Sequence, residues 1–169
     1  NYTQDIRTFE LAFIDITDPK EERVVAIPKS VIMGALTGRA DKRSIDCEDL
    51  PFKIDVDGYV QNARLRRASK TDKNRATRGV GLSSLPEAVR PGSGTDNEGG
   101  IDMPAMYVTL VGKSDGKSLG THLVSFETTL SDLSDSVAAG DKTFRIDFRP
   151  KRYYKPYVFE LIDVKKEDY

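Results

Sequence analysis

Few residues in this sequence are able to do covalent chemistry. There is one cysteine, Cys47, and one histidine, His122, so a Cys–His pair is the only conventional nucleophile arrangement available. The surrounding sequence gives no sign that these two residues meet. Phosphate-binding glycine loops, histidine pairs with metal-ligand spacing and nucleophile elbows are absent. The sequence therefore predicts a protein that is not an enzyme and that has no metal site.

Each of these two residues has an ordinary interpretation and a sharper one. His122 falls in an alternating run whose same-face neighbours are apolar, which is typical of a partly buried, hydrogen-bonded imidazole. The sharper interpretation is an axial ligand to haem iron, which an imidazole can supply. Cys47 stands between Asp46 and Glu48, and their charges disfavour the thiolate. We expect an inert thiol, and the alternative is a contact with haem or with a thiol-bearing partner.

A basic and aromatic block near the C-terminus is the best binding candidate. Its cations suit carboxylates such as haem propionates or acidic side chains, and its tyrosine rings offer flat apolar contact area. Alternatively, cations and rings satisfy one another within the fold. Single-stranded nucleic acid is also bound by such blocks, but a pI near 5.9 disfavours that partner. The block comprises Arg149, Lys151, Arg152, Tyr153, Tyr154, Lys155 and Tyr157.

Two alternating segments would position this block. Residues 143–149 alternate phenylalanine or isoleucine with charged residues, which predicts a half-buried strand. A second alternating run begins at Tyr157 and continues to Val164. The sequence therefore predicts two strands joined by a basic, aromatic corner.

The rest of the chain predicts further short strands separated by turns. Residues 9–16 are apolar on both faces, which indicates a central strand, and 23–27 would form a hairpin with them. Residues 52–56 alternate as far as a bulge at Asp57–Gly58, and 106–111 with 119–126 predict a second hairpin. The expected fold is all-β, an antiparallel sandwich or partly open barrel of about seven to nine short strands.

One long stretch interrupts this pattern. Residues 66–100 contain almost no large apolar side chains and are rich in Gly, Ser, Pro and charged residues. Such a composition predicts a long mobile loop without regular structure. The alternative is a lid or docking arm for an acidic partner, since the first half of the stretch is basic.

The C-terminal block FRPKRYYKPYVFELIDVKKEDY resembles a segment of ResB-type cytochrome c biogenesis proteins. Weaker matches in the same order are 9–15, 25–28, 50–56, 103–108 and 116–120. The resemblance implies an extracytoplasmic domain of the system II machinery, which carries haem across the membrane and attaches it to apocytochrome c with a ResC/CcsA-type partner. It implies a scaffolding role, with haem bound by the full complex, and it transfers no catalytic residue to this chain.

Composition agrees with a single domain spanning 1–169. The chain has 26 basic and 27 acidic residues, so no global charge of one sign would attract nucleic acid or a membrane surface. No run approaches the roughly 18–20 apolar residues of a membrane span. The ResB resemblance implies that the parent protein is anchored by transmembrane helices before Asn1 and after Tyr169. The alternative function is an exported β-sandwich that binds a protein or a glycan.

Overall fold

The computed structural model describes residues 2–38, 43–92 and 101–155. Ten strands in these ranges form antiparallel sheets, and helix is confined to three short elements. One sheet has the order β2 (Arg23–Pro28), β1 (Tyr2–Asp15), β10 (Lys142–Tyr154) and β9 (Ser136–Ala139). The other has the order β3 (Ser44–Ile45), β4 (Phe52–Val60), β7 (Ala105–Gly112) and β8 (Ser118–Ser125). The all-β prediction is therefore confirmed, with more strands than expected.

The core lies between these two four-stranded sheets. Phe52 of β4 has no exposed surface, and its ring packs edge-on against Phe13 of β1 and Phe144 of β10, with centroids 5.2 and 5.4 Å apart. Rings from both sheets thus interdigitate, as in a β-sandwich. No hydrogen-bonded ladder joins the two sheets within the described ranges, so the fold is not a closed barrel.

β1 is the central strand that its sequence predicts. Every residue from Phe9 to Asp15 is buried, because β2 and β10 flank the strand on either side and both of its faces are covered. The expected hairpin with β2 is also confirmed, with Leu11 opposite Ile27. In the second sheet, β7 and β8 form the other predicted hairpin, and Gly58 (φ +60°) lies in the predicted irregularity of β4.

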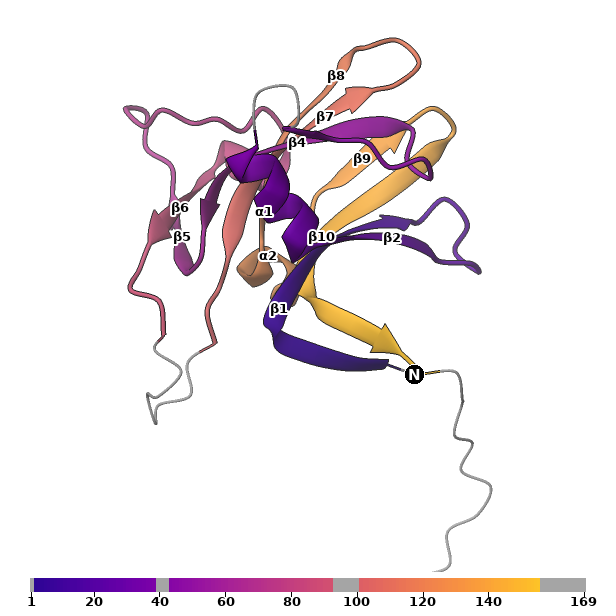
Figure 1. Cartoon of the computed structure of the whole chain (residues 1–169). Helices are drawn as coiled ribbons and strands as arrows, with labels where there is room; N and C mark the ends of the chain where they lie inside the picture. Colours follow the sequence, from indigo (N-terminus) through magenta and orange to yellow (C-terminus); the bar gives the residue numbers. More distant parts are fainter. Residues whose placement is uncertain (1, 39–42, 93–100, 156–169) are drawn as a thin grey trace, which may run out of the picture.

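The predicted corner after Arg149 is wrong, because Pro150–Tyr154 belong to the same strand, β10, as the residues before them. Lys151–Tyr154 pair with Tyr2–Asp5 of β1, and the register then jumps so that Phe9 lies opposite Pro150. Pro150 has no N–H to donate, and a bulge of β1 opposite it accommodates the missing bond. In Figure 1 this end of β1 and β10 extends away from the two sheets. The predicted second strand, 157–164, lies outside the described residues.

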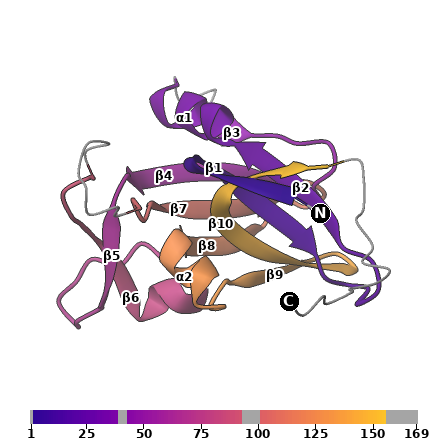
Figure 2. The same cartoon turned by 90° about the horizontal axis from the view of Figure 1, so that it is seen from below.

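The predicted loop at 66–100 is wrong in part: residues 68–78 and 89–92 have no regular secondary structure, but two strands and a short helix lie in the same stretch. β5 (Ala63–Arg67) pairs with β6 (Ser84–Ala88), and a 3₁₀ helix, η2 (Gly79–Leu82), lies between them. The backbone N–H of Thr77 donates to the carbonyl of Thr121 at 2.9 Å, which ties the segment to β8. In Figure 2 the β5–β6 hairpin stands at one end of the molecule, close to α2 (Phe126–Leu130). Mobility of the stretch stays a prediction.

The first helix, α1 (Lys29–Thr37), follows β2 directly and closes one side of the core with Ile32, which has no exposed surface. The second helix, α2, begins at a capping box in which Ser125 accepts from the backbone N–H of Thr128 at 3.0 Å. Such a cap satisfies helix N–H groups that have no partner within the helix. It fixes α2 beside β8 and the start of the segment that leads to β9.

Candidate functional site

The extended end of β1 and β10 places five members of the predicted basic, aromatic block on a two-stranded surface or next to it. We call Tyr2–Asp5 together with Lys151–Tyr154 the aromatic ribbon. Residues directly opposite one another in an antiparallel pair project from the same face. The register therefore puts Tyr2 and Gln4 with Arg152 and Tyr154 on one face, and Thr3 and Asp5 with Lys151 and Tyr153 on the other.

Each face of the aromatic ribbon carries a cation stacked on a tyrosine. The Arg152 Cζ atom lies 4.3 Å from the ring centroid of Tyr2, and the Lys151 Nζ atom lies 4.6 Å from that of Tyr153. Tyr154 packs against Tyr2 with centroids 5.8 Å apart. Such pairs contribute about 0.5–1 kcal/mol at exposed sites. The cations are thus held in place by rings, as one of the two sequence interpretations proposed.

The rings nevertheless remain open to solvent. Tyr153 is 48% exposed, Tyr154 61% and Tyr2 42%. In the described part of the chain, no carboxylate forms an ion pair with Lys151 or Arg152, and Asp5 instead accepts from the N–H of Arg7 at 3.0 Å. The aromatic ribbon therefore offers flat apolar area beside two partly exposed cations that have no carboxylate partner among the described residues, although the Nε atom of Arg152 is itself buried.

Arg149 does not belong to this surface. Its side chain is 2% exposed, and its Nε donates to Oε1 of Glu10 at 3.1 Å. Both terminal guanidinium nitrogens are buried and have no hydrogen-bond partner. Arg149 is thus an internal residue that joins β10 to β1, and its predicted surface role is wrong for this conformation. Lys155 is exposed just beyond β10, and Tyr157 lies outside the described residues.

His122 lies in a buried network instead of a surface site. Its Nδ1 atom lies 2.9 Å from Oδ2 of Asp135, and the two side chains are 3% and 6% exposed. The other carboxylate oxygen of Asp135 accepts from the backbone N–H of Val80 at 2.9 Å. The ordinary interpretation, a hydrogen-bonded buried imidazole, describes this geometry. Nε2 of His122 is buried without a partner.

Gly79 is required by the same network. Its backbone adopts φ +62°, and a Cβ atom there would lie 1.8 Å from the carboxylate of Asp135. Only glycine combines that conformation with that approach. The network therefore fastens the 3₁₀ helix η2 to the segment between α2 and β9.

Cys47 is half-buried against the core, in a short segment held by lysine contacts. Its carbonyl accepts from Lys113 Nζ at 2.6 Å, and the same Nζ lies 2.7 Å from Asp46. The hydrogen bond from Lys113 lowers the pKa of Asp46 below its ordinary value. No hydrogen bond links Cys47 to His122 among the residues described, so the structure does not assemble a Cys–His pair.

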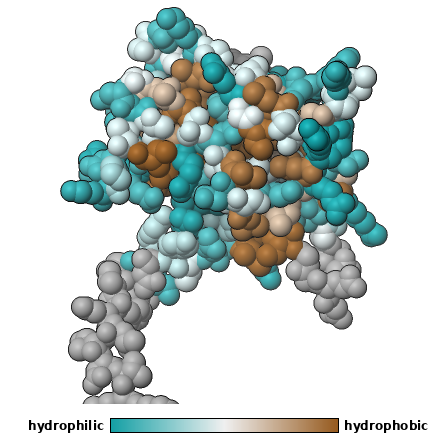
Figure 3. Space-filling model, turned by 180° about the vertical axis from the view of Figure 1, so that it is seen from behind, coloured by the Kyte–Doolittle hydropathy of each residue, from teal (hydrophilic) through white to brown (hydrophobic). Residues whose placement is uncertain are grey.

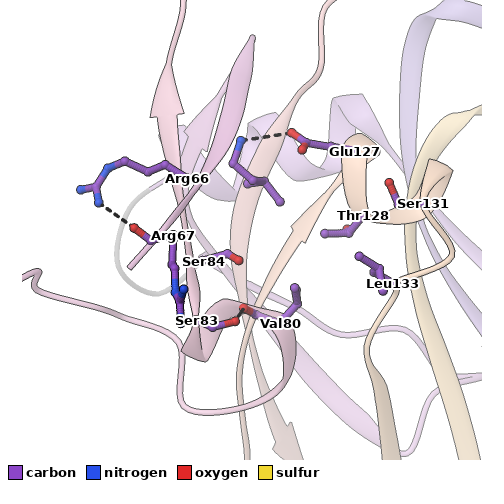
Figure 4. Close-up of a pocket in the computed structure, with 10 residues that line it drawn as sticks. Arg66, Arg67, Val80, Ser83, Ser84, Glu127, Thr128, Ser131 and Leu133 are labelled. Atoms are coloured by element: carbon purple, nitrogen blue, oxygen red, sulfur yellow. Dashed lines mark hydrogen bonds between the residues drawn. The ribbon is translucent and has the colours of Figure 1, made fainter. Parts of the chain in front are cut away.

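A pocket of about 470 Å³ opens between the β5–β6 hairpin, η2 and α2 (Figure 4). We call it the β5–α2 pocket. Glu127 of α2 accepts from the N–H of Leu65 at 3.1 Å and so joins its two sides. Arg66 points away from it and binds Asp72 with two 2.8 Å hydrogen bonds, which hold the pKa of Asp72 well below its ordinary value. Its lining comprises Leu65, Arg66, Arg67, Val80, Ser83, Ser84, Glu127, Thr128, Ser131 and Leu133.

The sequence analysis did not predict the β5–α2 pocket, because one of its walls lies within residues 66–100, which were predicted to be a loop. The opposite wall had a detectable signal, since Ser125 and Thr128 have the spacing of a helix cap. Leu130 and Leu133, 60% and 59% exposed, follow that cap. Figure 3 shows apolar side chains gathered on the rear face of the molecule.

Three further observations bear on function. No cluster of His, Cys, Asp and Glu within the described ranges could hold a metal ion. Neither α-helix of the described chain has the length and apolar character needed to cross a bilayer. No family model, curated protein or solved structure matches this chain.

Proposed function

We propose that this chain is the non-catalytic extracytoplasmic domain of a ResB-like membrane protein in cytochrome c maturation, where it scaffolds haem and apocytochrome c. The observation that carries the proposal is the aromatic ribbon. Within the segment whose sequence resembles the family, Lys151–Tyr154 pair with Tyr2–Asp5 beyond the bulge at Pro150, and Tyr153 and Tyr154 are exposed beside Lys151 and Arg152. The partners in this proposal are apocytochrome c and a ResC/CcsA-type membrane protein.

The side chains of the aromatic ribbon suit contact with the outer parts of a haem, the macrocycle face and the propionates, and not with its iron. A haem has an apolar macrocycle and two propionates, so it needs flat apolar contact and one or two cations. Tyrosines on the ribbon supply the first, and Lys151 and Arg152 the second. Each cation would exchange a ring contact of about 0.5–1 kcal/mol for a charge-assisted hydrogen bond of about 1.5–3 kcal/mol.

His122 fits axial ligation poorly in this conformation. Its unpartnered Nε2 is an available nitrogen in chemical terms, but the side chain is 3% exposed and Asp135 holds the ring. Iron would reach it only if the interior opened. We therefore assign haem contact to the aromatic ribbon, where no part of the core must move. Cys47 is half-buried, and its position gives no support to a contact with haem or with a thiol-bearing partner.

The second candidate is an exported sandwich that binds a protein or a glycan through the same ribbon. One observation favours it: the cations already stack on Tyr2 and Tyr153, which leaves tyrosine faces and edges as the main free contact area. Haemin titration separates the two functions. A saturable Soret shift that weakens when Lys151 and Arg152 are neutralised supports haem handling. Absence of haemin binding and of binding to a CXXCH peptide would leave the second candidate.

A further inference from the structure

The β5–α2 pocket is independent of the aromatic ribbon, and its walls are fixed by hydrogen bonds. On one side, the Leu65 N–H donates to Glu127, which ties the hairpin to α2. Below, the Val80 N–H donates to Asp135, which also holds His122. The capping box at Ser125 fixes the start of α2. A cavity framed in this way is largely pre-formed, as small-molecule sites usually are.

The pocket carries one unsatisfied charge of each sign. Arg66 forms an ion pair with Asp72, whereas Arg67 forms no ion pair within the described residues. Glu127 uses Oε2 for the Leu65 N–H, and Oε1 accepts no hydrogen bond from the described chain. Arg67 and Glu127 do not pair with each other, and in Figure 4 they approach from opposite sides. The cavity is therefore positive at one side and negative at the other.

Apolar side chains and hydroxyl groups line the space between these charges. Leu65, Val80 and Leu133 supply apolar surface, and Leu133 is 59% exposed at the pocket. Ser84 and Ser131 supply hydroxyls that can donate or accept. The volume of about 470 Å³ falls within the range of ligand pockets, about 300–1,000 Å³. It is larger than a single free amino acid needs.

We propose that the β5–α2 pocket binds a small zwitterion with an apolar body, of the chemical class of a dipeptide with aliphatic side chains. The ligand ammonium pairs with Glu127, and its carboxylate pairs with Arg67, where a guanidinium presents two parallel donors. The aliphatic side chains contact Leu65, Val80 and Leu133. Opposite charges on ligand and walls fix the orientation, and a ligand with only one charge leaves the other wall charge unpaired.

The test uses three matched probes: leucyl-leucine, its N-acetyl form and its C-terminal amide. Binding to the whole chain is measured by calorimetry, and the amide NMR signals of Leu65 and Ser131 report the place of binding. Each blocked probe should bind about tenfold or more weakly, because it loses one charge-assisted contact. Glu127→Gln should abolish the effect of acetylation and leave the effect of amidation. Arg67→Gln should do the reverse.

Arg64→Gln is the matched control, because Arg64 lies on the same strand but outside the pocket lining. It should leave the affinity for all three probes unchanged. Retained Leu65 amide shifts in Glu127→Gln verify that the frame survives, since a glutamine oxygen can still accept the hydrogen bond. Three results overturn the proposal: no binding of leucyl-leucine, equal losses in Arg64→Gln, or blocking effects that persist in both pocket variants.

Discussion

Arg149 of β10 donates a hydrogen bond from Nε to Oε1 of Glu10 of β1 at 3.1 Å, with both side chains almost completely buried. The remaining two guanidinium nitrogens have no partner. The pair therefore carries a large desolvation cost that one hydrogen bond offsets only in part. It sits just before the bulge at Pro150, where the sandwich ends and the aromatic ribbon begins.

We predict that breaking this pair is far worse than replacing it. Glu10→Leu or Arg149→Met alone should cost about 3–5 kcal/mol of unfolding free energy, because each leaves a buried charged group uncompensated. The double variant Glu10→Leu/Arg149→Met should lose much less or even gain stability, as buried pairs replaced by apolar residues often do. Urea denaturation measures all three. A double variant as unstable as the sum of the singles would contradict the prediction.

Gly79→Ala should destabilise the fold through the buried Asp135 network. A Cβ atom at Gly79 meets the carboxylate at 1.8 Å, and φ is +62°. Gly116→Ala is the matched control, since φ is +65° there and nothing lies within 4 Å. The control should cost about 1–2 kcal/mol for the backbone alone, and Gly79→Ala should cost on the order of 1–3 kcal/mol more. Equal losses in thermal denaturation would mean that Asp135 moves aside freely.

Stability should fall in acid partly because of Asp72. Hydrogen bonds from Arg66 and Ser69 hold the pKa of Asp72 in the folded protein well below the ordinary value of an aspartate. A carboxyl group whose pKa is lower in the folded than in the unfolded state stabilises the fold at every pH above its unfolded-state pKa. This stabilisation is lost as the pH falls through the folded-state pKa. Asp72→Asn should thus be less stable than wild type at neutral pH and approach it below about pH 3. Urea titrations across this range measure the convergence, and a constant difference at every pH would refute it.

Neutralising the aromatic ribbon should weaken haemin binding. Lys151→Gln/Arg152→Gln removes both propionate partners and should lower the affinity about tenfold or more. Lys20→Gln/Arg23→Gln is the control, because it removes the same charge at the exposed β1–β2 turn. Spectroscopic titration at the Soret band provides the measurement. Equal weakening in both double variants would show that net charge alone attracts haemin.

His122→Ala separates the two haem hypotheses. The variant leaves Asp135 buried without its imidazole, so it should cost about 1–3 kcal/mol of stability. Haemin affinity should stay unchanged at temperatures where the variant is folded. Selective loss of the Soret shift in folded His122→Ala would instead assign iron ligation to this residue.

Apolar patterns predicted the sandwich but not its charged and polar parts. β1 and the β7–β8 hairpin were predictable because their own residues carry the pattern. β5 and β6 were not, since Thr77, Thr121 and Glu127 hold that segment through bonds to distant elements. Pro150 reads as a strand end, and only the bulge opposite it explains why β10 continues.

The candidate site was predictable in composition and not in geometry. Alternation assigns Arg149 to the solvent face, but that face is closed over at this point, where Ala12 and Asp147 are also buried. The cation–π contact between Arg152 and Tyr2 joins residues from opposite ends of the described chain, and no local sequence pattern reveals such a contact. The β5–α2 pocket depends on the same kind of long-range arrangement.

The pairing of β1 with β10 also has a consequence for biosynthesis. Among the described strands, β1 is synthesised before the others and β10, which pairs along its length, is synthesised after them, so much of the apolar surface of β1 stays without a partner while the strands between them are made. Contacts of such wide sequence separation are typical of slow-folding β proteins. A nascent chain of this protein would need protection from aggregation until Lys142–Tyr154 has emerged from the ribosome.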